Sequence, residues 1–174
     1  PVVNKKYPEL ILLVGLVIGA FTTGGQMTQP NTIFSVAALD VASVVDANIS
    51  VLYHGDDATH RTALYEDSSI NTWTITAGVN LVGGALDANW KVWAALYNGV
   101  ASQFWKNGVS EAGPGNAGVE NMDGLSIGAR WDASFPWDGD IAELIFYDAN
   151  LSNADKNQVG QYLATRYGLA YTDI

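Results

Sequence analysis

The sequence predicts an all-β fold, a two-sheet antiparallel β-sandwich with one C-terminal α-helix. Three observations support this prediction. Short segments rich in β-branched and aromatic residues follow one another between Gly, Asn, Asp and Ser residues, two Asn-Gly dipeptides indicate hairpins, and one helical pattern with capping signals stands near the C-terminus. Many short strands in succession are typical of sandwiches and barrels.

Length and composition limit the number of domains and the kinds of partner that the chain can have. The 174 residues predict a single domain over residues 1–174, because a chain of about 150 residues already buries roughly 70% of its unfolded surface. Eight Lys and Arg oppose eighteen Asp and Glu, and the resulting formal charge of −10 would repel a phosphate backbone, so we expect no nucleic-acid partner. Because cysteine is absent, stability must come from packing and not from disulfide bonds.

The apolar run from Leu10 to Phe21 follows two lysines, which is the layout of a secretory signal peptide. Its twelve residues are fewer than the about 20 that cross a bilayer. We therefore predict one or two buried strands, interrupted at Gly15 and Gly19, and no membrane insertion.

Seven segments read as strands. They are Asn31 to Leu39, Ile49 to Tyr53, Asn71 to Gly78, Lys91 to Tyr97, Val100 to Lys106, Leu125 to Ala129 and Ile141 to Tyr147. The dipeptides Asn98-Gly99 and Asn107-Gly108 suit type I′ turns, in which both residues need a positive φ. These segments predict a β-meander.

A two-residue loop at Asn98-Gly99 would place Trp93 opposite Phe104 and Val92 opposite Trp105. Large apolar side chains then occupy both faces of the meander. A solitary sandwich alternates more cleanly between apolar and polar residues, so this pattern favours an outer face that is covered within a larger assembly.

The strand at Ile141 to Tyr147 runs into a helix that we predict from about Asn153 to Tyr167. Ser152 is a suitable N-cap, Asp155 lies in the first turn, and Gly168 is placed for the left-handed residue after the last turn. Four residues at helical spacing form one apolar stripe that should pack on the sandwich: Val159, Tyr162, Leu163 and Tyr167. In the strand, alternation would place Ala142 on the same face as Leu144 and Phe146.

The order "WKVWAALYNGVASQFWKNG", "DGLSIGAR" and "WDGDIAELIFYDANLSNADKNQVGQYLATRYGL" resembles the concanavalin A-like lectin/glucanase jelly roll, in its laminin G-like branch of bacterial and phage proteins. The resemblance covers roughly Thr28 to Leu169. One departure is "LVGLVIGAFTTGG", which stands where such domains often carry an early Phe-Asp-Gly segment followed by acidic residues. The resemblance implies a jelly roll, a fold that serves lectins, glycosidases, polysaccharide lyases, adhesion modules and virion components.

Glucanases of this fold resemble one another in a strand that carries alternating acidic residues. Here, Glu66 and Asp67 are adjacent and should point to opposite faces, while Asp138 and Asp140 precede the strand that contains Glu143. We therefore predict that the protein is not an enzyme.

The segment "HGDDATHR", His54 to Arg61, contains two histidines and two aspartates. Asp56 and Asp57 would suit calcium, which prefers oxygen ligands. Asp-Asp after Gly is also ordinary turn chemistry. We favour the turn and predict no cofactor, with calcium as the alternative.

The segment "RWDASFPWDGD", Arg130 to Asp140, offers a better ligand site. Trp131 and Trp137 flank Asp132 and Asp138. An aromatic ring beside a carboxylate suits a sugar, which stacks its C–H face on the ring and donates its hydroxyls to oxygen. We predict these four residues as ligand-binding, and the alternative is that either Trp caps the edge of the core.

These observations predict a non-catalytic, surface-exposed binding module for glycan recognition or adhesion. The alternative is a structural accessory protein of a bacteriophage virion, such as a capsid decoration, fibre or tail component. A glycoside hydrolase or polysaccharide lyase ranks below both. Expected partners are a glycan or other protein subunits in a homo-oligomer or larger assembly, and the expected location is extracellular, on a cell surface or on a virion.

Overall fold

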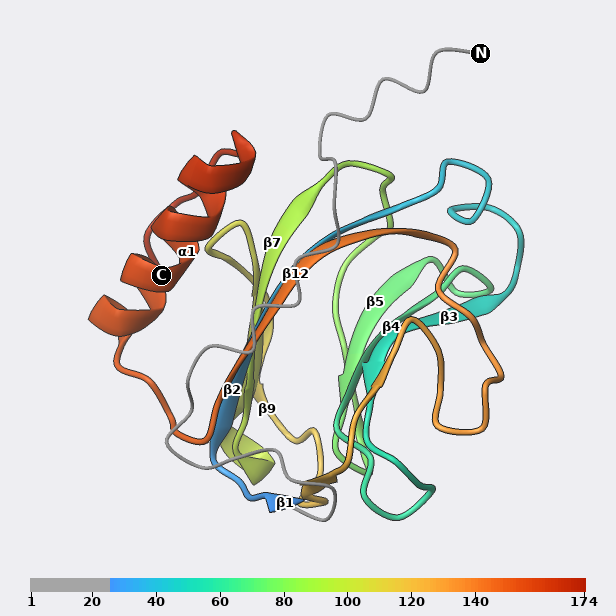
Figure 1. Ribbon diagram of the computed structural model, residues 1–174, viewed down its shortest axis with the longest axis horizontal. Helices are drawn as coiled ribbons and strands as arrows, with labels where there is room; N and C mark the ends of the chain where they lie inside the picture. Colours follow the sequence, from blue (N-terminus) through green and yellow to red (C-terminus); the bar gives the residue numbers. More distant parts are fainter. Residues whose placement is uncertain (1–25) are drawn as a thin grey trace.

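The computed structural model describes residues 26–174, which form two five-stranded antiparallel sheets packed face to face and one helix outside them (Figure 1). The sheet that carries the helix, here called the helix-side sheet, has the strand order β12 (Gly139–Tyr147), β2 (Asn31–Leu39), β7 (Lys91–Tyr97), β8 (Ser102–Lys106) and β9 (Val109–Gly115). The opposite sheet has the order β11 (Ser126–Ile127), β3 (Ile49–His54), β4 (Ala63–Asp67), β5 (Thr72–Thr76) and β6 (Asn80–Val82). A two-stranded pair joins β1 (Gln26–Met27) to β10 (Met122–Asp123), and the helix is α1 (Asn153–Tyr167).

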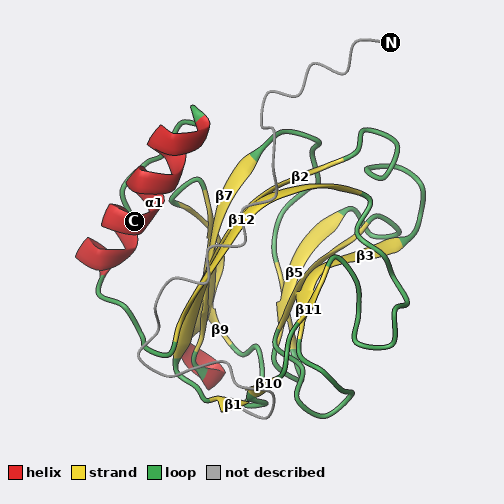
Figure 2. Ribbon diagram, viewed as in Figure 1, coloured by secondary structure: helices red, strands yellow, loops and turns green. Residues whose placement is uncertain are grey.

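The predicted fold class is confirmed: the described residues form an antiparallel β-sandwich with one C-terminal α-helix (Figure 2). Each of the seven predicted strands overlaps an observed one, whereas β1, β4, β6, β9 and β10 were not predicted. The predicted strands within Leu10 to Phe21 lie outside the described residues. Among the residues that the structure describes, no helix has the length and apolar character needed to span a membrane.

Aromatic side chains fill the space between the sheets. Trp73 from β5 and Trp93 from β7 meet with ring centroids 4.5 Å apart, and both are almost completely buried. The hydroxyls of Tyr53 and Tyr97 lie 2.9 Å apart, and Tyr97 also donates to the carbonyl of Ala63 at 2.7 Å. These hydrogen bonds satisfy polar atoms that would otherwise be costly in the core.

A second apolar layer lies between the helix-side sheet and α1. Side chains of β2, β7, β8 and β12 meet the buried face of the helix there: Phe34, Val36, Val92, Trp105, Ile145, Leu163, Ala164 and Tyr167. The prediction of large apolar side chains on both faces of the meander is therefore confirmed, but the interpretation that an assembly covers the outer face is wrong. Trp105 is only 4% exposed, and the Lys156 ammonium of α1 lies 4.7 Å from its ring centroid.

The first hairpin differs from the predicted one. A short 3-10 helix, η1 (Gly99–Ala101), lengthens the connection, so Trp93 pairs with Lys106 and not with Phe104. Trp105 accordingly pairs with Ala94. Because the register moves by two residues, every side chain keeps its predicted face. The second turn forms as predicted, with φ of 53° at Asn107 and 81° at Gly108.

The helix begins and ends as predicted. The Ser152 hydroxyl accepts a hydrogen bond from the Asp155 N–H at 3.2 Å, and Gly168 takes the left-handed conformation with φ of 66°. The buried face of the helix differs from the predicted apolar stripe at Tyr162, which is 44% exposed. Gly160 and Ala164 lie on the buried face instead.

In β12 the alternation is broken. A bulge between Ile141 and Glu143 turns Ala142 toward the helix and away from Leu144, with which it was expected to share a face. A bulge adds one residue to a strand, so alternation read from the sequence fails at that point.

Candidate functional site

A groove lies on the outer face of the opposite sheet, on the side of the sandwich that faces away from α1. It has a volume of about 260 Å³. Strands β3, β4, β5 and β6 and the loops that follow β3 and β11 contribute its lining residues: Ile49, Val51, His54, Ala58, Arg61, Ala63, Tyr65, Thr76, Asn80, Arg130, Trp131 and Phe135. Figure 1 shows the loop from β11 to β12 beside β3, in orange.

Strand alternation forms the floor of the groove. Leu52 and Leu64 belong to the core between the sheets, so the neighbouring Val51 and Tyr65 turn outward and line the groove. The small side chain of Ala63 lies between the longer ones along this floor. The sheet therefore presents a shallow, mainly apolar surface.

The wall is the loop from β11 to β12, which backbone hydrogen bonds fasten to β3. The Val51 N–H donates to the Phe135 carbonyl at 3.0 Å, and the Gly128 N–H donates to the Leu52 carbonyl at 2.9 Å. The backbone of Phe135 has a φ of 53°, and a positive φ is uncommon for a residue with so large a side chain. The loop is thus held in one conformation against the strand.

At the mouth of the groove, an arginine lies between two aromatic rings. The guanidinium carbon of Arg130 is 5.4 Å from the ring centroid of Trp131 and 5.4 Å from that of Phe135. Both rings are 37% exposed. Asp132 forms an ion pair with Arg130 at 3.1 Å and accepts a hydrogen bond from the Ser134 N–H at 3.1 Å. Hydrogen bonding from Ser134, together with the Arg130 charge, holds the pKa of Asp132 below its usual value.

Two further polar side chains, His54 and Arg61, line the groove. His54 is 5% exposed, and its Nδ1 lies 2.9 Å from the Gly55 carbonyl oxygen. Burial lowers the pKa of His54, which favours the neutral ring. Arg61 donates to both carboxylate oxygens of Glu120, from Nε at 2.9 Å and from Nη2 at 2.8 Å.

The structure divides the four residues predicted as ligand-binding between two places. Trp131 lines the groove with Asp132 beside it. Trp137 packs against the core, with its ring centroid 6.2 Å from that of Trp73, as in the alternative in which a Trp caps the core edge. Asp138 accepts a hydrogen bond from the Ser43 hydroxyl at 2.6 Å and lines a separate pocket at the end of β2.

Other groove residues were not predicted as ligand-binding. Arg130 and Phe135 stand in the same segment as Trp131, so their proximity was a usable sequence signal. His54, Arg61 and Tyr65 come from other parts of the chain, and only strand pairing brings them to the groove.

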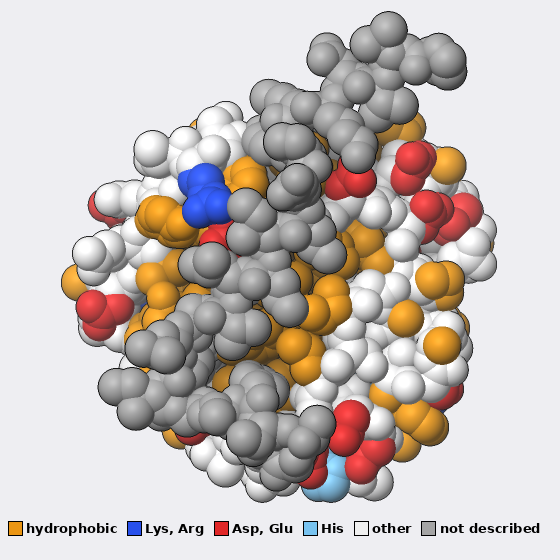
Figure 3. Space-filling view, viewed as in Figure 1, with side chains coloured by type: hydrophobic (Ala, Val, Ile, Leu, Met, Phe, Trp, Pro, Cys, Tyr) orange, Lys and Arg blue, Asp and Glu red, His pale blue; other side chains and the backbone are white. Residues whose placement is uncertain are grey.

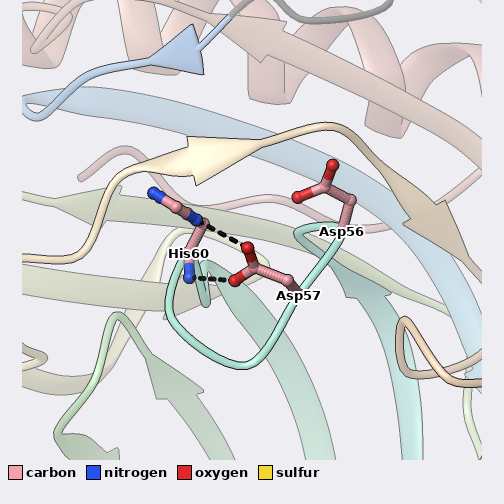
Figure 4. Close-up of side chains that lie close together, drawn as sticks. All are labelled: Asp56, Asp57 and His60. Atoms are coloured by element: carbon pink, nitrogen blue, oxygen red, sulfur yellow. Dashed lines mark hydrogen bonds and ion pairs between the residues drawn. The ribbon is translucent and has the colours of Figure 1, made fainter.

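Asp56, Asp57 and His60 lie close together in the loop between β3 and β4, with potential ligand atoms within 4.8 Å of one another (Figure 4). One Asp57 oxygen accepts from the backbone N–H groups of Thr59 at 2.6 Å and His60 at 2.8 Å. The other lies 2.8 Å from His60 Nδ1, and this contact raises the pKa of His60.

Calcium takes about six to eight oxygen ligands, whereas this cluster offers two carboxylates and an imidazole nitrogen. The side chains of this cluster alone therefore do not complete a calcium site. The hydrogen bonds within the loop instead match the turn chemistry that the sequence favoured.

Glu66 and Asp67 point to opposite faces of β4, as predicted. Glu66 is fully buried between the sheets, while Asp67 accepts from the Ser69 N–H at the end of the strand, at 3.1 Å. A retaining glycosidase needs two carboxyl groups about 5 to 5.5 Å apart beside its substrate. These two carboxylates do not share a face on which they could meet one.

Comparison with known proteins gives structural matches only: no protein-family model matches the chain, and no curated protein matches its sequence. A putative carbohydrate binding protein from Bacteroides ovatus is similar with a TM-score of 0.61 and 16% identity, over 82% of this chain and 43% of that one. A Trypanosoma rangeli sialidase is similar with a TM-score of 0.57 and 14% identity, over 79% of this chain and 26% of that one.

A third similar structure is domain 4 of AbnA, an extracellular GH43 arabinanase from Geobacillus stearothermophilus, solved with arabinotriose. It has a TM-score of 0.54 and 13% identity, over 77% of this chain and 68% of that one. This chain spans less than half the length of the first two proteins. At these identities the matches show the fold alone, a two-sheet antiparallel β-sandwich.

Proposed function

We propose that this chain is a non-catalytic carbohydrate-binding module that holds a glycan in the groove on the outer face of the opposite sheet. The observation that carries the proposal is the exposed ring of Trp131 at the mouth of a groove with a mainly apolar floor. Sugar-binding sites combine an aromatic surface with a few polar groups that fix orientation. Thr76, Tyr65 and Asn80 supply such groups here.

The structural matches support this proposal. One is described as a putative carbohydrate binding protein, and another is a domain solved with arabinotriose. We propose the laminin G-like branch and an extracellular or cell-surface location as part of the same function. Asp132 orients Arg130 in this proposal, and Trp137 supports the loop from the core side.

One argument for the virion alternative was an apolar outer face that another subunit would cover. Helix α1 of the same chain packs on that face, so this argument no longer favours an assembly role over glycan binding.

The test is the affinity of the purified chain for a panel of soluble neutral and acidic polysaccharides. Trp131→Ala should weaken binding by about 1 to 3 kcal/mol because it removes the stacking surface. The matched control is Tyr162→Ala, which removes an exposed aromatic ring from the helix on the far side of the sandwich. Equal binding by both variants, or polysaccharide turnover by the wild type, would contradict the proposal.

A further inference from the structure

The charged side chains that line the groove are cationic, although the chain as a whole is acidic. The chain has a formal charge of −10 and only three arginines. Two of them, Arg61 and Arg130, line the groove, and none of the described residues that line it is Asp or Glu. On the face shown in Figure 3, by contrast, acidic side chains are spread widely while Lys and Arg form one small patch.

The two arginines differ in how firmly they are paired. Arg61 is held by both oxygens of Glu120, which also accepts a hydrogen bond from the Arg61 N–H at 3.0 Å. Arg130 has a looser partner, because Asp132 approaches one of its nitrogens at 3.1 Å. The Arg61 side chain is 41% exposed and the Arg130 side chain is 35% exposed, so the looser ion pair, and not greater exposure, makes Arg130 the cation that is freer to bind a ligand.

The two rings beside Arg130 prepare it for an anion. Because Trp131 and Phe135 both contact the guanidinium, its plane is restricted before a ligand arrives, which reduces the entropy lost on binding. A guanidinium presents parallel N–H donors that match the oxygens of a carboxylate or sulfate group. A neutral ligand would add no second charged partner to the one that Asp132 already provides.

We propose that the glycan is acidic, and that Arg130 contacts its carboxylate or sulfate group while a neighbouring sugar ring stacks on Trp131. This inference rests on the proposed glycan-binding function and adds the chemical class of the ligand.

The experiment uses polysaccharides in matched pairs. Polygalacturonate is compared with its methyl-esterified form, dextran sulfate with dextran, and arabinan serves as a further neutral probe. The chain should bind at least one acidic member and bind its neutral partner more weakly, and raising the salt concentration should reduce the binding of the acidic member. Polygalacturonate and dextran sulfate distinguish a carboxylate ligand from a sulfate ligand.

Three variants assign the effect to Arg130. Arg130→Gln should lose about tenfold or more in affinity for the acidic probe, as expected for a hydrogen bond to a charged group, while Arg130→Lys should retain part of it. The matched control is Arg166→Gln, because Arg166 is also about one third exposed, lies near two aromatic rings and has an acidic partner. Thermal melting confirms that each variant is folded.

The outcomes separate this inference from the proposed function. Neutral probes that bind in a Trp131-dependent manner, with no effect of Arg130→Gln, would overturn the acidic class and leave glycan binding intact. An equal loss in Arg130→Gln and Arg166→Gln would show that binding follows overall charge, and would also overturn the inference. Binding to none of the probes would overturn both proposals.

Discussion

Glu66 is a carboxyl group inside the sandwich. It is fully buried, its Oε1 accepts a hydrogen bond from the Ser50 hydroxyl at 2.5 Å, and its Oε2 has no hydrogen-bond partner among the described residues. Burial raises the pKa of Glu66 to about 7. Below about pH 7 the folded protein therefore holds the Glu66 side chain mainly in its protonated form.

The first prediction concerns the pH dependence of stability. Because the folded pKa of Glu66 is raised, its contribution to stability is complete at low pH and is lost as pH rises through about 7. The free energy of unfolding then falls with pH by at most about 1.4 kcal/mol per pH unit. Glu66→Gln keeps the acceptor for Ser50 and should remove this slope, so chemical denaturation at pH 5 and pH 8 should show a smaller loss of stability in the variant. An unchanged difference between the two pH values would show that Glu66 does not titrate in this range.

The second prediction concerns Asp132, which would compete with the proposed acidic ligand for Arg130. Asp132→Asn keeps an acceptor for Ser134 but removes the negative charge, so affinity for the acidic probe should rise. An exposed ion pair contributes about 0 to 1 kcal/mol, which corresponds to an increase of up to about fivefold. Titration with that probe measures the effect. Weaker binding would instead favour Asp132 as an acceptor for a sugar hydroxyl, as the sequence suggested.

Helix α1 shows how one element depends on a few positions. Leu163 is fully buried against the helix-side sheet, whereas the adjacent Tyr162 is 44% exposed. The Tyr167 hydroxyl donates to the buried Glu143 carboxylate at 2.8 Å, and Arg166 approaches the same oxygen at 3.4 Å. The helix therefore covers an apolar layer and also supplies partners to a buried charge.

The third prediction compares two neighbouring positions of this helix. Leu163→Ala should lower the free energy of unfolding by about 2 to 5 kcal/mol, because it leaves a cavity under the helix. Tyr162→Ala should change it by about 0.5 kcal/mol, as is usual at the surface. Thermal or chemical denaturation of both variants provides the comparison. Equal effects would show that α1 does not pack with Leu163 inward.

The outer faces of the two sheets are covered to different extents. Helix α1 covers much of the helix-side sheet, with Trp105 buried beneath Lys156, and a pocket of about 840 Å³ lies between β8, β9 and the start of α1. The opposite sheet leaves its outer face open at the groove. In the proposed function, ligand recognition depends on the groove of the opposite sheet, whereas Trp105 and α1 contribute to stability.

The fourth prediction follows from this division. Trp105→Ala should cost about 3 to 5 kcal/mol of stability, because a large buried side chain is removed, and it should leave the oligomeric state unchanged. Denaturation and size-exclusion chromatography measure the two quantities. A variant that keeps its stability but changes its apparent mass would restore the interpretation of Trp105 as an assembly contact.

Local patterns identified much of the fold. The bounds of β2, β7 and α1 agree with the predicted ones, because β-branched runs and helix caps are signals within a few residues. Strand β9 was missed because its sequence, "VSEAGPG", contains Gly and Pro, which are rare in strands. In that strand, pairing with β8 overrides local preference.

Composition and local sequence thus determined the all-β class, the capped helix and the presence of Trp131 and Asp132 side by side in one loop. The register of the strands and the burial of the outer face of the helix-side sheet depended on contacts between distant segments of the chain. The η1 turn set the pairing of Trp93, and the helix settled what covers Trp105. The groove also required tertiary structure, because Arg61 and Tyr65 reach Arg130 only after β3 and β4 pair and the loop from β11 to β12 fastens to β3. Such contacts join residues far apart in the chain, and periodicity within a short segment does not report them.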